Sequence, residues 1–250
     1  MVDEPQERFT MVDALIMIRT SLFTRFKTNA LSFTRRWRST LAGDERREIA
    51  FFDVETTVPT KAGQPSAILE FGSILVCPKT LVELHSYSTL VRPTDLSLIT
   101  TISKQRSGIT RDDVLSAPTF AEISGKVYDI LNGRVWAGHN IKRFDCARIR
   151  EAFAEIGQSP PEPKDIIDTL LLMSKKFGNR AGDMKMASLA KYYGLGDQAH
   201  RSLLDCRLNL EILKLFAASE FLESILCSSV LETLQTDAAD EAKTGIAGYV

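Results

Sequence analysis

Residues 48–57 read EIAFFDVETT, and this stretch decides the fold. Its first half is a short apolar run containing Phe51 and Phe52, which predicts a buried β-strand over residues 48–54. Asp53 and Glu55 follow two residues apart. Because alternate residues of a strand point to the same face, we expect both carboxylates to project together from the end of this strand. That placement is costly unless a cation lies between them, although acid-x-acid pairs also arise by chance at solvated strand ends.

The segments that follow predict a sheet flanked by helices. Two strand-like stretches, residues 66–78 and 80–93, meet at Pro78-Lys79-Thr80 and predict an antiparallel hairpin. A strand is also predicted over 134–138, and helices over 118–131, from Asn140 to about Gly157, and near 168–177, 186–193 and 202–227. Strands first, then strands and helices mixed, indicate a three-layer α/β fold with a mixed β-sheet.

The charge is distributed unevenly along the chain. The 250 residues are 44% hydrophobic with a net charge of −1, which is typical of globular proteins and excludes wholesale disorder. Residues 14–43 nevertheless contain six basic residues and no acid. We therefore expect a basic extension over residues 1–44 that is poorly ordered or serves targeting, a folded domain over 45–230, and a flexible tail over 231–250.

The basic extension is open to several interpretations, which are a solvated arm, an arm for nucleic acid, a membrane-surface helix and an organelle transit peptide. Acids close to the N-terminus disfavour a transit or secretory signal, and no apolar run is long enough to cross a bilayer. We expect a cytoplasmic or nuclear protein without stable membrane insertion, with an organelle as the alternative. The four cysteines form no C-x-x-C pair, which favours reduced thiols over a thiolate zinc site.

Three further residues join the first acidic pair as candidates. Asp145 lies about one turn into the helix that Asn140 is expected to cap, where the helix dipole also favours an acid. His200 precedes Asp205 by five residues, and Ser202 has the capping-box spacing to Asp205. A histidine titrates near neutral pH, so one that is close to a carboxylate is suited to act as a general base.

Three motifs, FFDVETT at residues 51–57, GHNIKRFD at 138–145 and HRSLLD at 200–205, together resemble the DEDDh (DnaQ-like) family of 3′–5′ exonucleases. The resemblance covers about residues 48–216. The connecting stretches, such as AILEFGSILVCPKTLVELHSYSTLVRPTDLSLI and RAGDMKMASLAKYYGLG, are more similar still to plant NEN-type exonuclease-domain proteins. This resemblance implies a ribonuclease-H-like fold, with a mixed sheet flanked by helices.

The resemblance also implies a two-metal exonuclease that releases 5′-mononucleotides from the 3′ end of DNA or RNA. Asp53 would bridge two Mg²⁺ ions, for which Mn²⁺ can substitute, while Glu55, Asp145 and Asp205 complete the coordination. His200 would take a proton from the attacking water. Crowded carboxylates repel one another and hard divalent cations relieve that repulsion, so physical chemistry makes the same demand. Many relatives form dimers, which makes a homodimer a further expectation.

The substrate contacts are weaker predictions. Thr56 matches a position that contacts the terminal nucleotide in the family, and Arg201 is a candidate phosphate contact, although a plain surface charge is the simpler interpretation. His139 is either a buried structural histidine or a phosphate contact, and Asn140 is expected to cap its helix rather than touch substrate. The alternative function is a non-catalytic nucleic-acid-binding module on the same scaffold. The sequence does not distinguish DNA from RNA, or single from double strands.

Overall fold

The computed structural model describes residues 46–178 and 180–245. The described residues up to Leu213 belong to one compact unit, and those from Lys214 onward belong to a second. The predicted basic extension, residues 1–44, lies outside the described residues. The candidate site residues all fall within the first unit, which is therefore the unit that bears on function.

A five-stranded mixed sheet forms the centre of the first unit, in the order β3-β2-β1-β4-β5. β1 pairs antiparallel with β2 and parallel with β4, while β2 pairs antiparallel with β3 and β4 parallel with β5. The strands are β1 (Ile49–Thr56), β2 (Ile68–Val76), β3 (Glu83–Leu90), β4 (Val135–Gly138) and β5 (Asp165–Asp168). The predicted first strand, the hairpin and the mixed sheet are therefore confirmed.

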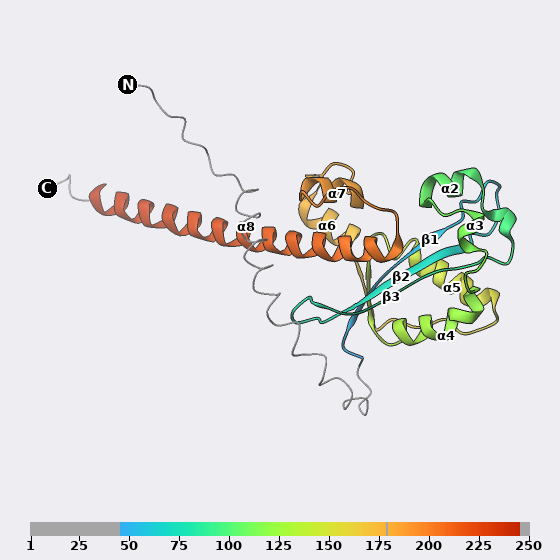
Figure 1. The fold of residues 1–250 in the computed structure, drawn as a ribbon. Helices are drawn as coiled ribbons and strands as arrows, with labels where there is room; N and C mark the ends of the chain where they lie inside the picture. Colours follow the sequence, from blue (N-terminus) through green and yellow to red (C-terminus); the bar gives the residue numbers. More distant parts are fainter. Residues whose placement is uncertain (1–45, 179, 246–250) are drawn as a thin grey trace, which may run out of the picture. The chain divides into compact units, whose positions relative to one another are not determined.

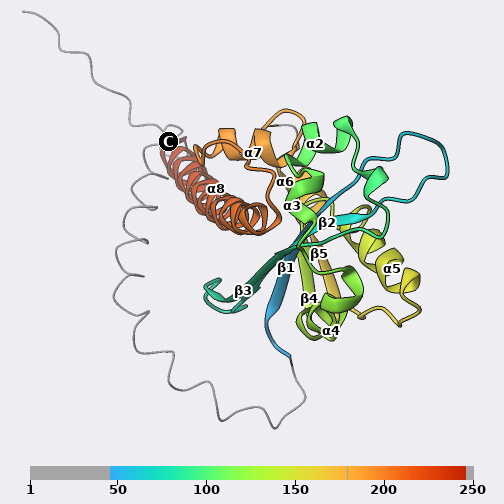
Figure 2. The same ribbon diagram turned by 45° about the vertical axis from the view of Figure 1, so that its right-hand side comes forward.

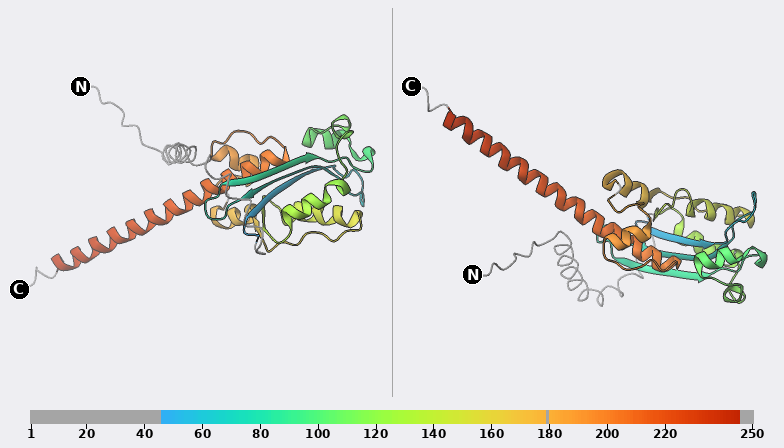
Figure 3. Two further views of the ribbon diagram at one scale, coloured as in Figure 1. Left: turned by 60° about the horizontal axis from the view of Figure 1, so that its bottom comes forward. Right: turned by 90° about the horizontal axis from the view of Figure 1, so that it is seen from above.

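Helices cover both faces of this sheet (Figures 2 and 3). On one face, α4 (Phe120–Leu131) and α5 (Asp145–Glu155) pack on a core that includes Phe52 and Trp136, whose rings meet edge to face at 5.3 Å. On the other, the start of α8 (Ser202–Gly245) packs on Phe51. The neighbouring phenylalanines thus serve opposite faces, as strand alternation requires. The three-layer α/β fold with a mixed sheet, predicted from the sequence, is confirmed.

The remaining elements surround the sheet. Leu69 of β2 packs with Ile99, Ile109 and Val114 in a separate buried cluster. The elements are the short 3₁₀ helix η1 (Leu96–Leu98) and the helices α2 (Thr101–Ser107), α3 (Arg111–Val114), α6 (Thr169–Phe177) and α7 (Met186–Tyr192). Within residues 46–178 and 180–245, no helix combines the length and apolar character that a membrane span requires.

The helix predicted to start at Asn140 is wrong over its first turn, because α5 begins at Asp145. Asn140 has a φ of 60°, in the left-handed region, and therefore does not cap the helix. The Asp168 carboxylate accepts the backbone N–H groups of Asn140 at 3.2 Å and of Lys142 at 3.1 Å. These contacts hold residues 140–142 in a turn, and they come from a strand, β5, that the sequence did not predict.

Helix α8 continues to Gly245, past its predicted end at residue 227 and past the predicted domain boundary at residue 230. Residues 231–245 are therefore helical, whereas the sequence indicated a tail there. Alanine has the highest helix propensity, and Ala238, Ala239 and Ala242 lie in this stretch of small and polar residues. Residues 246–250 lie outside the described residues.

Candidate active site

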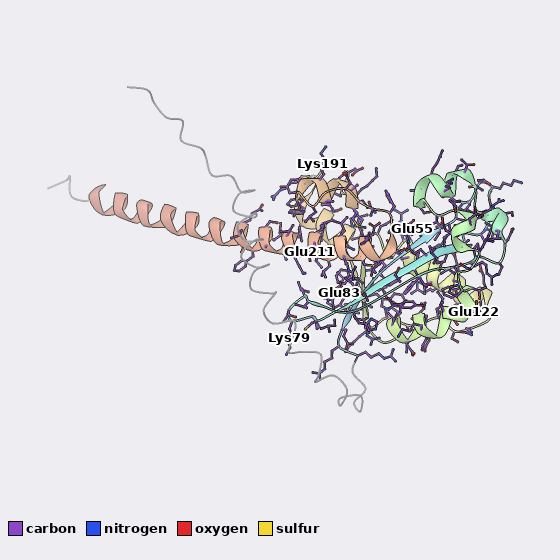
Figure 4. All side chains as sticks on the ribbon, in the orientation of Figure 1. Glu55, Lys79, Glu83, Glu122, Lys191 and Glu211 are labelled. Carbon is purple, nitrogen blue, oxygen red and sulfur yellow. The ribbon has the colours of Figure 1, made fainter. Side chains whose placement is uncertain are left out.

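Strand β1 carries the first two acids, Asp53 and Glu55, to its end, where Figure 4 labels Glu55. The pKa of Asp53 is raised well above its usual value, first by its removal from water and then by the charges of Asp145, Glu55 and Asp205. Four carboxylates from three distant segments of the chain lie close enough here to raise the pKa of Asp53 by mutual repulsion. The structure thus brings together the acids that the sequence singled out.

Asp145 joins this group from the first residue of α5, where it is 3% exposed. The backbone N–H of Val54, which lies between the two acids of β1, donates to Asp145 Oδ1 at 3.1 Å. Burial raises the pKa of Asp145 to about 7, although this hydrogen bond opposes the shift. The hydrogen bond ties the start of α5 to β1 and fixes the carboxylate beside Asp53.

Asp205 and His200 enter from the start of α8 and the loop before it. Ligand atoms of Glu55, His200 and Asp205 all lie within 4.8 Å of one another, so this cluster could hold a metal ion. Gln198 Nε2 donates to Asp205 Oδ2 at 2.7 Å, whereas Asp205 Oδ1 is buried with no hydrogen-bond partner among the described residues. Burial first, and then the charge of Asp205, raises the pKa of Glu55 to about 8.

Gly72 explains why α8 approaches the sheet so closely. It lies on β2 directly opposite Asp53 in the β1–β2 register. A Cβ atom at position 72 would lie 2.3 Å from the backbone nitrogen of Leu203 and 2.7 Å from Ser202 Cβ. Only glycine leaves room for the first turn of α8 at this point, and that turn carries Asp205 into the acidic group.

The predicted capping box of Ser202 and Asp205 does not form. The backbone N–H of Ser202 instead donates to Glu70 Oε2 at 3.1 Å, and Arg201 grips the same carboxylate through Nε and Nη2. Asp205 is thereby left to face the acids of β1. Sequence reasoning missed Glu70, although a single acid within the apolar strand ILEFGSILV was a usable signal, because a buried carboxylate needs a partner.

The predicted substrate residues have different surroundings. Thr56 is half-buried at the end of β1, where the pairing with β2 is irregular. His139 Nδ1 lies 3.2 Å from Thr169 Oγ1, and burial lowers its pKa, which favours the structural interpretation. Asn140 lies in the turn held by Asp168. The Arg201 side chain is 48% exposed although it pairs with Glu70. The substrate roles of these residues stay predictions.

Two cysteines that directly follow candidate acids pack in the core rather than facing solvent. Cys146 lies in the core between the sheet, α4 and α5, and Cys206 lies in the core beneath α8. Cys77, Cys146 and Cys206 form no disulfide in the part of the chain that the structure describes. Cys206 Sγ donates to the carbonyl oxygen of Gly72 at 3.5 Å, and burial raises the pKa of this thiol well above its usual value.

Comparison with known families and curated proteins gives one consistent result. The RNase_T family, described as Exonuclease, matches residues 50–213. Protein NEN3 of Arabidopsis thaliana is 75% identical over 186 residues, and Protein NEN1 of the same plant is 69% identical over 183 residues. These matches cover 74% and 73% of this chain but only 37% and 39% of the two relatives. Protein NEN4 of that plant is 62% identical, with 72% of this chain and 70% of the relative covered.

Solved structures show the same fold at low sequence identity. Exonuclease I superposes with a TM-score of 0.60 at 18% identity, covering 68% of this chain and 40% of the other. A zinc-bound complex of E. coli exonuclease I with single-stranded DNA gives a TM-score of 0.61 at 17% identity, covering 70% and 41%. The family match spans well over half of the sequence and contains every candidate site residue. The chain therefore belongs to the exonuclease family.

Proposed function

We propose that this chain is a metal-dependent 3′–5′ exonuclease that hydrolyses DNA or RNA to 5′-mononucleotides. The observation that carries the proposal is the meeting of Asp53, Glu55, Asp145 and Asp205, whose pKa values are all raised. Perturbed ionisable groups gathered beside a histidine are typical of a catalytic site. The solved complexes of E. coli exonuclease I with oligonucleotides support nucleic acid as the substrate class.

The donor set fits divalent metal ions. Four carboxylates that raise one another's pKa lack compensating positive charge, and one buried oxygen, Asp205 Oδ1, has no hydrogen-bond partner among the described residues. Carboxylate oxygens suit hard cations such as Mg²⁺ and Mn²⁺. Asp53, Glu55, Asp145 and Asp205 would hold two such ions. When bound, the ions would supply electrostatic stabilisation for the attacking and leaving oxygens of the displacement.

The protein residues would orient the substrate and move the proton. His200 is exposed to solvent, yet its ring lies within reach of Glu55 and Asp205, so it is placed to accept the proton of the attacking water. Thr56 and Arg201 are proposed to contact the terminal nucleotide and its phosphate. The buried hydrogen bond from Val54 to Asp145 keeps the acidic group in register while substrate enters.

A time course on matched single- and double-stranded DNA and RNA tests the proposal. With label at the 5′ end, we expect a ladder that shortens one nucleotide at a time; with label at the 3′ end, labelled 5′-mononucleotide should appear first. Digestion should require Mg²⁺ or Mn²⁺ and stop in EDTA. A ladder that shortens from the 5′ end would contradict the direction. Binding without digestion, in every metal, would support the alternative of a non-catalytic nucleic-acid-binding module.

A further inference from the structure

We propose that Glu70 is a positioning residue for the nuclease, because it fixes the turn that carries His200 to the start of α8. This inference rests on the proposed function. The Glu70 side chain is 3% exposed on β2, and its carboxylate receives Arg201 Nη2 at 2.8 Å and Arg201 Nε at 3.1 and 3.2 Å. It also accepts the backbone N–H of Ser202 at 3.1 Å. One buried group therefore holds the two residues that follow His200.

The turn needs such a support. His200 has a φ of 51°, a left-handed conformation that costs free energy in a residue other than glycine and persists only where the surroundings impose it. The loop before it contains Gly194 and Gly196, both with positive φ, which allow many alternative paths. On the C-terminal side of His200, the chain is held by charge-assisted hydrogen bonds from Arg201 and Ser202 to the Glu70 carboxylate.

The position of Glu70 in the sheet links this support to the acids. Glu70 lies directly opposite Glu55, a candidate metal ligand, in the β1–β2 register. The residue that holds the His200 turn is therefore the strand neighbour of a residue that would bind the metal. Glu70 thereby fixes the imidazole of His200 relative to Glu55 without itself taking part in the chemistry. A small displacement of a catalytic group lowers the rate strongly, so a shift of the His200 ring should be measurable as a loss of digestion rate.

The same helix supplies a matched control. Arg207 of α8 binds Glu83 of β3 with the same geometry, through Nε at 2.9 Å and Nη2 at 2.8 Å. Glu83 pairs with Val76, and Val76 pairs with Ile49, the first residue of β1, so this second ion pair lies at the end of the sheet opposite Glu55. Figure 4 labels both Glu55 and Glu83. Glu83→Gln therefore removes a similar ion pair without touching the His200 turn.

Steady-state digestion of a labelled oligonucleotide compares Glu70→Gln with Glu83→Gln in the full chain. We expect Glu70→Gln to lower kcat by about tenfold to 100-fold, the usual effect of losing a supporting partner, and to raise KM as well, because Glu70 also holds Arg201, the proposed phosphate contact. Glu83→Gln should leave both constants within about twofold, since this partly exposed ion pair lies at the other end of the sheet from Glu55 and, among the described residues, makes no contact with the His200 turn. Equal kcat values for the two variants would overturn the proposal.

A second readout does not depend on activity. The chain contains three histidines, so the ¹⁵N–¹H imidazole spectrum is simple, and His200→Ala assigns the His200 signal by its loss. We expect Glu70→Gln to shift or broaden that signal while Glu83→Gln leaves it in place. An unchanged His200 signal in Glu70→Gln would refute the positioning role, even if the wild-type chain digests no nucleic acid and the proposed function fails by itself.

A further pair covers the case in which Glu70→Gln does not fold. Arg201→Lys keeps the charge but loses the planar two-nitrogen grip on the carboxylate, and Arg207→Lys makes the same change at the control pair. We expect Arg201→Lys to lower kcat and move the His200 signal, and Arg207→Lys to do neither. Matching behaviour of the two lysine variants would overturn the proposal as well.

Discussion

Among single residues, Asp53 is the one whose carboxylate is repelled by all three other acids of the site. We predict that Asp53→Asn reduces nucleotide release to background while it stabilises the metal-free protein, because a neutral amide removes the repulsion that raises its pKa. The gain should appear as a higher Tm of the variant than of the wild type in EDTA. Asp205→Ala should likewise abolish release without unfolding the chain. Full activity in either purified variant would contradict the site assignment.

His200 is the second residue whose chemistry can be separated from folding. It is exposed and its ring lies near Glu55 and Asp205, so truncation leaves no cavity in the core. We predict that His200→Ala lowers kcat by about 10²-fold or more, the usual contribution of a general base, with little change in Tm. Single-turnover digestion at saturating Mg²⁺ measures the loss. A rate within about threefold of wild type would assign proton transfer to another group.

Among the elements, the contact between β2 and α8 depends on the absence of a side chain at Gly72. We predict that Gly72→Ala destabilises the protein by about 1–3 kcal/mol and lowers activity, because the added methyl group would overlap the first turn of α8. Gly125→Ala is the matched control, since Gly125 lies within α4 and its added Cβ would meet nothing within 4 Å. That substitution should stabilise by about 0.5–1 kcal/mol. Urea unfolding measures the free energy of unfolding of both variants, and equal values would contradict the predicted overlap with α8.

Elements whose signals are local could be predicted, and those held by distant contacts could not. The apolar run with Phe51 and Phe52 needs no other segment to identify it as a strand. Residues 140–144 contain a good N-cap residue, yet the carboxylate of Asp168 holds the turn that displaces the helix start to Asp145. β5 has the sequence DIID, in which two acids flank only two apolar residues, so it lacks the apolar run that identified the equally short β4, and only pairing with β4 makes it a strand.

For the molecule as a whole, the candidate site was predictable in its acids but not in its supports. Asp53, Asp145 and Asp205 belong to motifs that are contiguous in sequence, so each could be found separately. Glu70 and Arg201 are separated by 131 residues, and nothing in the sequence around either residue indicates that the two form an ion pair. The closeness of β2 to α8 is visible only once the chain has folded, because Gly72 has no side chain to suggest it.

The same acidic group makes the stability of the metal-free protein depend on pH. Folding raises the pKa of Glu55 from 4.5 to about 8 and that of Asp145 from 3.8 to about 7. The folded protein therefore binds more protons than the unfolded chain between about pH 4 and about pH 8, and its stability falls as the pH rises through this window. Divalent ions compete with these protons, so the stabilisation they provide should grow over the same range.

Thermal unfolding at about pH 6, 7 and 8, in EDTA and in saturating Mg²⁺, tests this dependence. In EDTA we expect the Tm to fall with rising pH, and the difference between the Mg²⁺ and EDTA curves to widen. Replacing Glu55 by Gln and Asp145 by Asn should make the EDTA curve less steep, because two of the four carboxylates whose pKa folding raises are gone. A metal-free Tm that rises from about pH 6 to 8 would mean that these carboxylates are already compensated, and the metal-binding interpretation of the acidic group would fail with it.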